Sequence, residues 1–375
     1  MTGTAVEQHF EAATRSARTH AEATESSRRL DARVVEALKA SGSFRLFVPT
    51  QYGGIGLGVL DILKHLRDLS AADGAAGWCA AIASTTSHVA GSVDRAWAEA
   101  IFRNPAGVTG GAFAPTGTAT RTPDGDLLVN GKWAWGSGSQ HCDWLCGGTK
   151  DPDGVFRIVF FPAGEANIID TWQSSGLRGT GSHDFEVAAL RVPEGCWSLP
   201  VGANVQVDDP LARMPMYTLF AGSIASVMLG IARRAIDEIS ELALTKRPTG
   251  SSKSLIEASS THVDVGKAEG LWRSATAWLD DEVGQAWTSV VAGDRVSVSR
   301  RASVRAAASH ASTSARQATD LAYDLGGGTS VYATSPLQRC FRDVHTASAH
   351  IMVHMRNTET FGRQLLGQPI ETSML

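Results

Sequence analysis

Apolar side chains in the first hundred residues recur at the spacing of amphipathic helices. Leu30, Val34 and Leu38 lie on one predicted helix face, and Gly42 is placed to end that helix as a C-terminal cap. The segment from Ala75 to Ala90 is rich in small residues, which lets neighbouring elements pack close to this predicted helix. Further helices are predicted from the leucines at 60, 63, 66 and 69 and from Arg95–Phe102.

The pattern changes near Gly107 to short apolar runs separated by Gly, Asp and Pro. Asp126–Val129, Asn130-Gly131 and Lys132–Trp135 together predict a β-hairpin, because Asn-Gly accepts the positive φ angles of a tight turn. Several short strands at close spacing are typical of a barrel or a sandwich. Further strands are predicted at residues 143–147, 156–161, 168–172 and 185–192.

After Asp208-Asp209-Pro210 the chain returns to long apolar helices, predicted at 220–244, 254–291, 297–325 and 337–366. Gly326–Gly328 separates the last two. This order predicts an α+β protein in three parts. They are an N-terminal α-helical domain (residues 1–105), a central β domain (106–206) and a C-terminal helical bundle (207–375).

Composition narrows the class of protein. The 375 residues are 43% hydrophobic and 19% charged, as expected of a chain with a large core. A net charge of −4 without a Lys/Arg block argues against nucleic-acid binding. The N-terminus lacks the apolar core of a signal peptide, and the longest weakly polar run, residues 75–93, is too polar to span a membrane. The sequence therefore predicts a cytoplasmic protein with no membrane partner.

Familiar nucleotide, hydrolase and metal motifs are missing. No G-x-G-x-x-G follows a strand, and neither a P-loop nor a G-x-S-x-G elbow occurs. The five cysteines form no Cys-x-x-Cys pair, so neither a zinc site nor a disulfide framework is expected. His350 and His354 share one face of the predicted last helix, but no carboxylate lies one turn before either of them. No metal site is predicted.

Three segments concentrate polar or glycine residues within apolar sequence. In Thr85–His88 the histidine is either a hydrogen-bonded core residue or a general base. In Trp133–Ser139 two tryptophans alternate and so share a face, and glycines let a flat ligand approach, unless this is only a bulged strand end. Tyr323–Tyr332 is a glycine-rich loop before a helix that carries Arg339 and Arg342. Together the segments predict a large, flat, anionic cofactor.

A resemblance to a known family rests on five segments: Phe47–Gly54, Trp78–His88, Val129–Gly138, Gly176–Asp184 and Ser335–Thr346. They resemble the acyl-CoA dehydrogenase superfamily, and more closely its branch of two-component flavin-dependent monooxygenases, which includes the oxygenases of 4-hydroxyphenylacetate and dibenzothiophene. The resemblance covers nearly the whole chain. It implies an acyl-CoA dehydrogenase-like fold with a central β-barrel and a four-helix bundle, assembled as a homotetramer or dimer, with flavin between barrel and bundle.

The resemblance also implies a chemistry. The chain would be an oxygenase component that uses O2 and reduced FMN or FAD, which diffuses from a separate NAD(P)H–flavin reductase. A flavin C4a-hydroperoxide would hydroxylate an aromatic or heteroatom-bearing small molecule. By the family's pattern, Ser137 lies near flavin N5, His350 on the last bundle helix faces flavin C4a, and His88 on the buried helix faces the substrate. These three residues are the predicted catalytic groups.

Binding residues follow from the same resemblance. Trp135 would cover the flavin ring, and Phe113 would line the pocket. The arginines would meet either the flavin phosphate or a neighbouring subunit. The predicted cofactor-binding residues are Phe113, Trp135, Gly136, Ser137, Arg247, Gly327, Gly328, Arg339 and Arg342, and the predicted substrate-binding residues are Trp78, His88 and Phe113.

Departures from the dehydrogenase pattern favour the monooxygenase branch. Aligned on the closing Leu-Leu-Gly, His350-Ile351 occupies the place of the dehydrogenase Tyr-Glu pair, so the base for α-proton removal is absent there. Glu257 is the remaining candidate for that base. Ala112–Pro115 is apolar where the phenol hydroxylases have a substrate-facing serine, so a substrate other than a simple phenol is expected. The alternatives are an acyl-CoA dehydrogenase-like flavin oxidoreductase and a non-catalytic homologue.

Overall fold

The N-terminal part of the chain is helical, as predicted. The computed structural model describes residues 3–199 and 205–375. Asp31 caps the start of α3, and Gly42 ends it at φ +73°, which confirms the predicted C-terminal cap. The helices are α1 (Gly3–Thr19), α2 (Ala21–Ser27), α3 (Ala32–Ser41), α4 (Val59–Ala72), α5 (Gly74–Ser87) and α6 (Arg95–Phe102).

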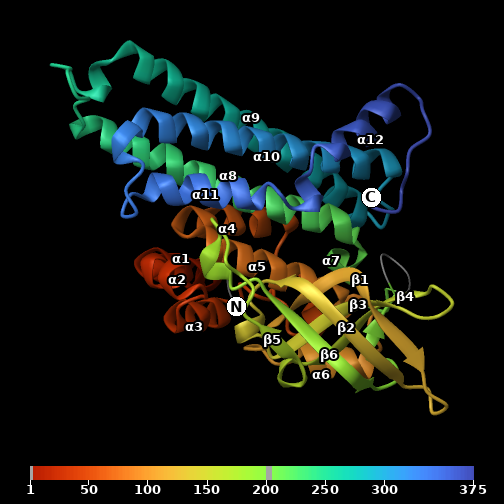
Figure 1. Ribbon diagram of the computed structural model, residues 1–375. Coiled ribbons are helices and arrows are strands. Elements are labelled where there is room, and N and C mark those ends of the chain that lie inside the picture. The colour runs from red at the N-terminus through yellow and green to blue at the C-terminus, as the bar shows by residue number, and fades with distance from the viewer. Residues whose placement is uncertain (1–2, 200–204) are drawn as a thin grey trace.

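Helix α5 is buried along its whole length. It lies between the C-terminal bundle and the sheet (Figure 1), and every residue from Gly74 to Ser87 is inaccessible to solvent or nearly so. Asp73 caps its start by accepting a hydrogen bond from the Ala76 amide at 3.1 Å. A Cβ on Gly77 would lie 1.8 Å from the Ser70 hydroxyl of α4. Small residues therefore let α5 pack closely on every side.

The central part of the chain forms one seven-stranded sheet in the order β5-β6-β2-β1-β3-β4-β7. Strand β1 pairs parallel to β3, and the other neighbouring strands are antiparallel. Among the described residues no ladder joins β5 to β7, so the predicted closure into a barrel is not confirmed. The strands are β1 (Thr109–Arg121), β2 (Leu127–Gly136), β3 (Trp144–Lys150), β4 (Phe156–Pro162), β5 (Asn167–Ile169), β6 (His183–Val192) and β7 (Trp197–Ser198).

The predicted hairpin at Asn130-Gly131 is wrong, because both residues lie inside β2. The tight turn comes earlier, between β1 and β2, where the Thr122 amide donates to the Asp126 carbonyl at 2.9 Å. Gly131 is a glycine for a different reason. A Cβ there would lie 2.3 Å from the indole of Trp133, which covers the backbone of the strand. Close ring packing and not turn geometry explains this glycine.

The two tryptophans of β2 do not share a face, contrary to the prediction. Trp133 is fully buried against Phe185, whereas Trp135 is 72% exposed. The β2–β6 register shifts between Trp133 and Gly136, and Trp135 has φ +63°. An irregularity of this kind breaks the two-residue alternation of a strand and turns one side chain to the opposite side. Trp133 is therefore a core residue, and Trp135 projects freely.

Long helices form the C-terminal bundle, as predicted. The final predicted helix, 337–366, is however two helices, because the segment from Ser348 to Met355 leaves helical geometry and holds only the short turn η8 (Ile351–Val353). His350 and His354 therefore do not share a helix face. The helices are α7 (Pro210–Arg213), α8 (Met216–Thr245), α9 (Ser259–Val291), α10 (Val298–Gly326), α11 (Pro336–Ala347) and α12 (Arg356–Leu365).

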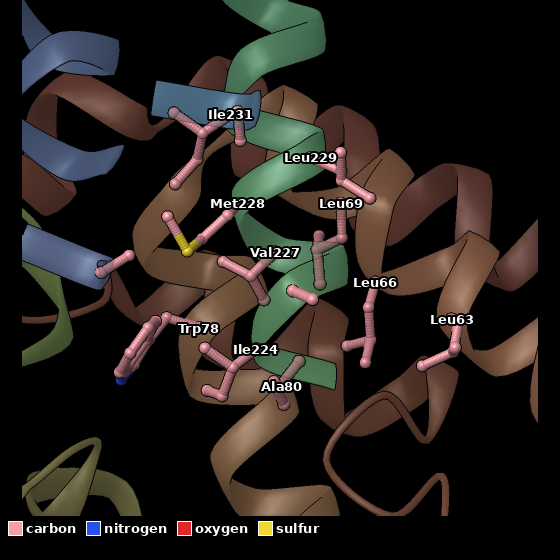
Figure 2. Packing of buried hydrophobic residues seen from close by; sticks show 14 of the residues in the cluster. Leu63, Leu66, Leu69, Trp78, Ala80, Ile224, Val227, Met228, Leu229 and Ile231 are labelled. Carbon is pink, nitrogen blue, oxygen red and sulfur yellow. The ribbon is translucent and has the colours of Figure 1, made fainter. Parts of the chain in front are cut away.

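The main core lies where α8 crosses α4 and α5. Figure 2 shows Leu66 and Leu69 of α4 on one side of α8 and Trp78 of α5 on the other, all within one cluster of buried residues. Among the described helices α8 alone is long and apolar enough to cross a membrane, but 83% of its most apolar window is buried inside the protein. Its composition is thus that of a core helix.

The predicted domain boundaries, after residues 105 and 206, fall in the connections between α6 and β1 and between β7 and α7. Elements on either side of each boundary share the two large clusters of buried residues. That the three parts are separate domains stays a prediction.

Candidate active site

The Ser137 hydroxyl, just past the end of β2, is the meeting point of three segments. The indole Nε1 of Trp78, on α5, donates to Ser137 Oγ at 3.0 Å. Ser137 Oγ lies 2.7 Å from Ser182 Oγ, which lies 2.6 Å from Thr180 Oγ1. The Gly138 amide also donates to the Thr180 carbonyl at 2.8 Å. These bonds fix the end of β2 to α5 and to the loop before β6.

Backbone strain is concentrated around this hydroxyl. Of the four described non-glycine residues with positive φ, Trp135 (+63°) and Leu177 (+49°) flank the site. Such a conformation costs about 1–3 kcal/mol for a bulky residue and persists where surrounding contacts enforce it. Gly136 has no room for a side chain, since a Cβ there would lie 2.7 Å from the ring of Phe185. The predicted cofactor-binding residues Trp135, Gly136 and Ser137 thus share a constrained turn.

His350 caps η8 and does not lie on a bundle helix, so its predicted position on the last helix is wrong. It nevertheless lies close to Ser137. Its ring packs edge-on against Trp78, with centroids 5.6 Å apart, and Trp78 in turn bonds Ser137. His350 Nδ1 accepts a hydrogen bond from the Met352 amide at 3.2 Å. Burial lowers the pKa of His350 to about 4, and the nearby charge of Arg305 adds to this effect. At neutral pH the ring is therefore uncharged, with its proton on Nε2.

Aromatic rings extend the cluster from His350 toward β1. The ring of Phe220, on α8, lies 5.1 Å from that of His350, and the ring of Phe113, on β1, lies 6.2 Å from that of Phe220. Both pairs are edge-to-face, the geometry that aromatic rings favour. Trp78, Ser137, His350 and Phe113 therefore come together as a group, with Phe220 as an additional member.

His88 is not in contact with this group. It follows the last residue of α5, about 15 Å along the helix from Trp78. Its Nε2 donates to the Leu211 carbonyl at 3.0 Å, which leaves Nδ1 as an acceptor. Burial lowers the pKa of His88 to about 4, and the carbonyls of Leu211 and Met214 oppose that shift. His88 is therefore a neutral, hydrogen-bonded core histidine at the far end of the helix.

The predicted phosphate-binding residues lie elsewhere. Arg247 is exposed in the loop after α8, and Gly327 and Gly328 follow α10 next to Lys246. This end of α8 is about 38 Å from Phe220 along the helix axis. A flavin is too short to reach from Ser137 to these residues within one chain.

Arg342 and Arg339 are on α11, nearer to the site. Arg342 donates to the Glu25 carboxylate at 2.9 Å, to the Gln338 side chain at 2.7 Å and to the Ser175 carbonyl. Its guanidinium therefore ties α11 to α2 and to the loop before β6. Arg339 lines a polar cavity of about 220 Å³ that it shares with Asp73 and Asp343.

Three contributors were missed by the sequence analysis. Phe220 was read only as the start of a bundle helix, although its ring joins Phe113 to His350. Thr180 and Ser182 lie in the Gly176–Asp184 segment that carried the resemblance, but no role was assigned to them. The sequence signal that could have identified them is a pair of hydroxyl residues, Thr180 and Ser182, separated by one glycine directly before a predicted strand.

Comparisons with known proteins agree on one family. Residues 5–96 match the family described as acyl-CoA dehydrogenase, N-terminal domain, and residues 223–355 match acyl-CoA dehydrogenase, C-terminal domain. Indole-3-acetate monooxygenase of Pseudomonas putida is 32% identical over 90% of this chain and 87% of its own length. The oxygenase component of an FADH2-dependent resorcinol hydroxylase from Rhizobium sp. is 27% identical over 93% of this chain and 91% of its own.

A solved structure extends the similarity to the whole fold. The crystal structure of 3-HSA hydroxylase from Rhodococcus sp. RHA1 superposes with a TM-score of 0.92 at 26% identity. The match covers 99% of each chain. The arrangement of helices and sheet described above is therefore that of the acyl-CoA dehydrogenase fold as flavin-dependent hydroxylases use it.

Proposed function

The chain belongs to the flavin-dependent monooxygenases built on the acyl-CoA dehydrogenase fold, and on this premise we propose that it hydroxylates a small aromatic molecule held against Trp78, Phe113 and Phe220. It is an oxygenase component that uses reduced flavin supplied by a partner reductase. This confirms the predicted class over a dehydrogenase-like oxidoreductase or a non-catalytic homologue. The observation that carries the substrate proposal is the continuous line of rings from Phe113 to Trp78.

The residues around Ser137 fit a reduced flavin. When bound, this cofactor reacts with O2 and delivers one oxygen atom to the substrate. Ser137 Oγ has a lone pair to accept the hydrogen on flavin N5, and the exposed Trp135 indole is free to cover the ring. His350 holds a proton on Nε2, which has no partner among the described residues, and would donate it as a hydrogen bond to the reacting oxygen. The apolar surroundings exclude water.

His88 is proposed to orient the substrate at the other end of α5. Its Nδ1 would accept a hydrogen bond from an N–H or O–H of the substrate, while the Leu211 carbonyl fixes the ring. Because burial lowers the pKa of His88 to about 4, Nδ1 carries no proton at neutral pH and can accept, while the ring proton stays on Nε2. This role applies to a substrate that extends from the rings at Trp78 toward His88, whereas a molecule the size of indole-3-acetate bound at the rings would not reach it.

An aromatic carboxylic acid is the substrate class that we propose first. Arg305 on α10 is buried and donates to the Met374 carbonyl at 2.5 Å and to the Asn357 side chain at 2.8 Å, but to no carboxylate among the described residues. The Asn357 side chain also donates to the Ile351 and Met352 carbonyls, so Arg305 lies close to the segment that carries His350. A buried, uncompensated guanidinium favours an anionic group close by. The acetate group of indole-3-acetate, which the Pseudomonas relative is named for, has this chemistry.

We also propose that a second copy of the chain completes the flavin site, as the predicted homotetramer or dimer requires. Arg247, Gly327 and Gly328 are too far from Ser137 to serve the flavin of their own chain. They would meet a flavin only across an interface between copies. The predicted cytoplasmic location is kept as part of this proposal.

Oxygen labelling tests the proposed function. The protein is loaded without oxygen with reduced FMN or FAD, and ¹⁸O2 is then added together with indole-3-acetate, indole or resorcinol. We expect one ¹⁸O atom in the product by mass spectrometry, most efficiently with the acid. Equal rates for indole and its acetate would remove the role of Arg305. Release of all the oxygen as hydrogen peroxide with every aromatic compound, together with bleaching of bound flavin by an acyl-CoA thioester, would overturn the proposal.

A further inference from the structure

Four hydrogen bonds run in series through the site, and the donor-to-acceptor direction is fixed at both ends of the series. Trp78 Nε1 bonds Ser137 Oγ at 3.0 Å, Ser137 bonds Ser182 at 2.7 Å, and Ser182 bonds Thr180 at 2.6 Å. Thr180 Oγ1 then bonds the Leu177 carbonyl at 2.8 Å. An indole N–H can only donate, and a carbonyl can only accept.

The two ends determine the direction of every bond between them. Three hydroxyl protons and one indole proton serve four bonds, so all four form only when each hydroxyl donates toward Leu177. Ser137 then accepts from Trp78 and donates to Ser182. One lone pair of Ser137 Oγ is left, and no proton. Toward any further ligand, Ser137 is therefore an acceptor.

We propose that this directed chain makes the site selective for the redox state of the flavin, with Thr180 and Ser182 as positioning residues that act through Ser137. The inference rests on the proposed function, in which flavin N5 meets Ser137. Reduced flavin carries a hydrogen on N5 and can donate it to the free lone pair. Oxidised flavin has only a lone pair at N5, so it finds no donor in Ser137.

Reversing the chain for oxidised flavin carries a cost. Ser137 can donate to N5 only if Ser182 and Thr180 both turn around, and Thr180 then gives up its bond to Leu177. The Leu177 carbonyl is well anchored, because the Trp172 indole also donates to it at 3.0 Å and the Leu177 amide donates to Asp343 at 2.6 Å. Reduced flavin thus gains one hydrogen bond over oxidised flavin, a difference of roughly 3- to 10-fold in affinity.

Removal of a distant hydroxyl tests the direction of the chain. In Thr180→Val the Ser182 proton loses its acceptor, so Ser182 and Ser137 can turn toward oxidised flavin without losing a bond. Titration of oxidised FMN or FAD, and of the reduced forms without oxygen, gives the ratio of the two dissociation constants. We expect Thr180→Val and Ser182→Ala each to lower the preference for reduced flavin by roughly 3- to 10-fold, mainly through tighter binding of the oxidised form.

Matched controls separate the chain from general damage to the fold. Thr319→Val removes a buried hydroxyl that bonds within α10, and Ser41→Ala removes one at the end of α3, so neither should change the ratio. Thr180→Ser keeps the hydroxyl and should restore it. An unchanged ratio in both Thr180→Val and Ser182→Ala would overturn the inference. A wild-type protein that binds neither form of flavin would instead contradict the proposed function.

Discussion

Asp343 offers a test of how α11 supports the active site. Its Oδ1 accepts a hydrogen bond from the Leu177 amide at 2.6 Å. Burial raises the pKa of Asp343 to about 7, and the negative charges of Glu25 and Asp73 add to the shift, whereas the Leu177 amide and Arg342 oppose it. The substitution Asp343→Asn keeps an oxygen for the Leu177 amide but cannot ionise. It therefore isolates the cost of the buried charge.

The sign of the pH effect follows from the raised pKa. Between the ordinary value of 3.8 and about 7, the folded protein holds a proton on Asp343 that the unfolded chain has released. The free energy of unfolding contributed by this group therefore falls as pH rises through that window. Each pH unit in the window corresponds to about 1.4 kcal/mol, so wild type should lose about 2–3 kcal/mol relative to Asp343→Asn between pH 5 and pH 8.

Urea unfolding of both proteins at pH 5, 6, 7 and 8 measures this difference. The buried histidines also titrate, but they are present in both proteins and cancel in the comparison. Asp73, with its pKa raised to about 6, interacts with the charge of Asp343, so its release from that charge in the variant is part of the measured difference. The advantage of the variant over wild type should grow by about 2–3 kcal/mol from pH 5 to pH 8. Stability curves that run parallel across this range would refute the reasoning.

Three further outcomes follow from the site and the sheet. Gly131→Ala should destabilise the protein by about 1–3 kcal/mol, because the new methyl group would lie 2.3 Å from the indole of Trp133. Gly164→Ala is the control, because the space around Gly164 is open and no loss of stability is expected. Thermal unfolding compares the two variants with wild type. Trp135→Ala should change the unfolding free energy by less than about 0.5 kcal/mol, since the side chain is 72% exposed, yet weaken flavin binding in a titration. The pKa values of His88 and His350 are both about 4, so neither ring changes its charge between pH 6 and pH 8. The amount of product formed per flavin oxidised should therefore stay constant over this range, and a change in that yield near pH 6.5 would contradict the neutral state of the two rings.

Most of the fold was predictable because strong periodic patterns were left intact by packing. The small-residue segment after Ala75, the first three long bundle helices and the glycine cap at Gly42 form as expected. The last helix breaks near His350 although its apolar pattern continues, because the histidine side chain caps the Met352 amide and a new turn begins there. A local side-chain bond of this kind competes with the helix and has no mark in the spacing of apolar residues.

The strand errors have a similar origin. Asn130-Gly131 is a strong turn signal by itself, but at this place the indole of Trp133 needs bare backbone beneath it. Only part of the site was predictable. Ser137 and Trp78 were singled out from short motifs, whereas their contact joins residues 59 positions apart and depends on how α5 lies against the sheet. Periodicity describes one element at a time and does not reveal such contacts.

One path of support for the Ser137 hydroxyl reaches back to the bundle through the loop before β6. Asp343 on α11 holds the Leu177 amide, and the Leu177 carbonyl ends the hydroxyl chain that begins at Trp78. The loop can make these bonds only because Gly176 passes close to α11, where a Cβ would lie 2.1 Å from the Arg342 carbonyl. A change that shifts α11 would therefore act on Ser137 without touching the flavin. The His350 amide donates to the Ala347 carbonyl at the end of α11 at 3.1 Å, so the same shift would also act on the ring contacts of His350 with Trp78 and Phe220.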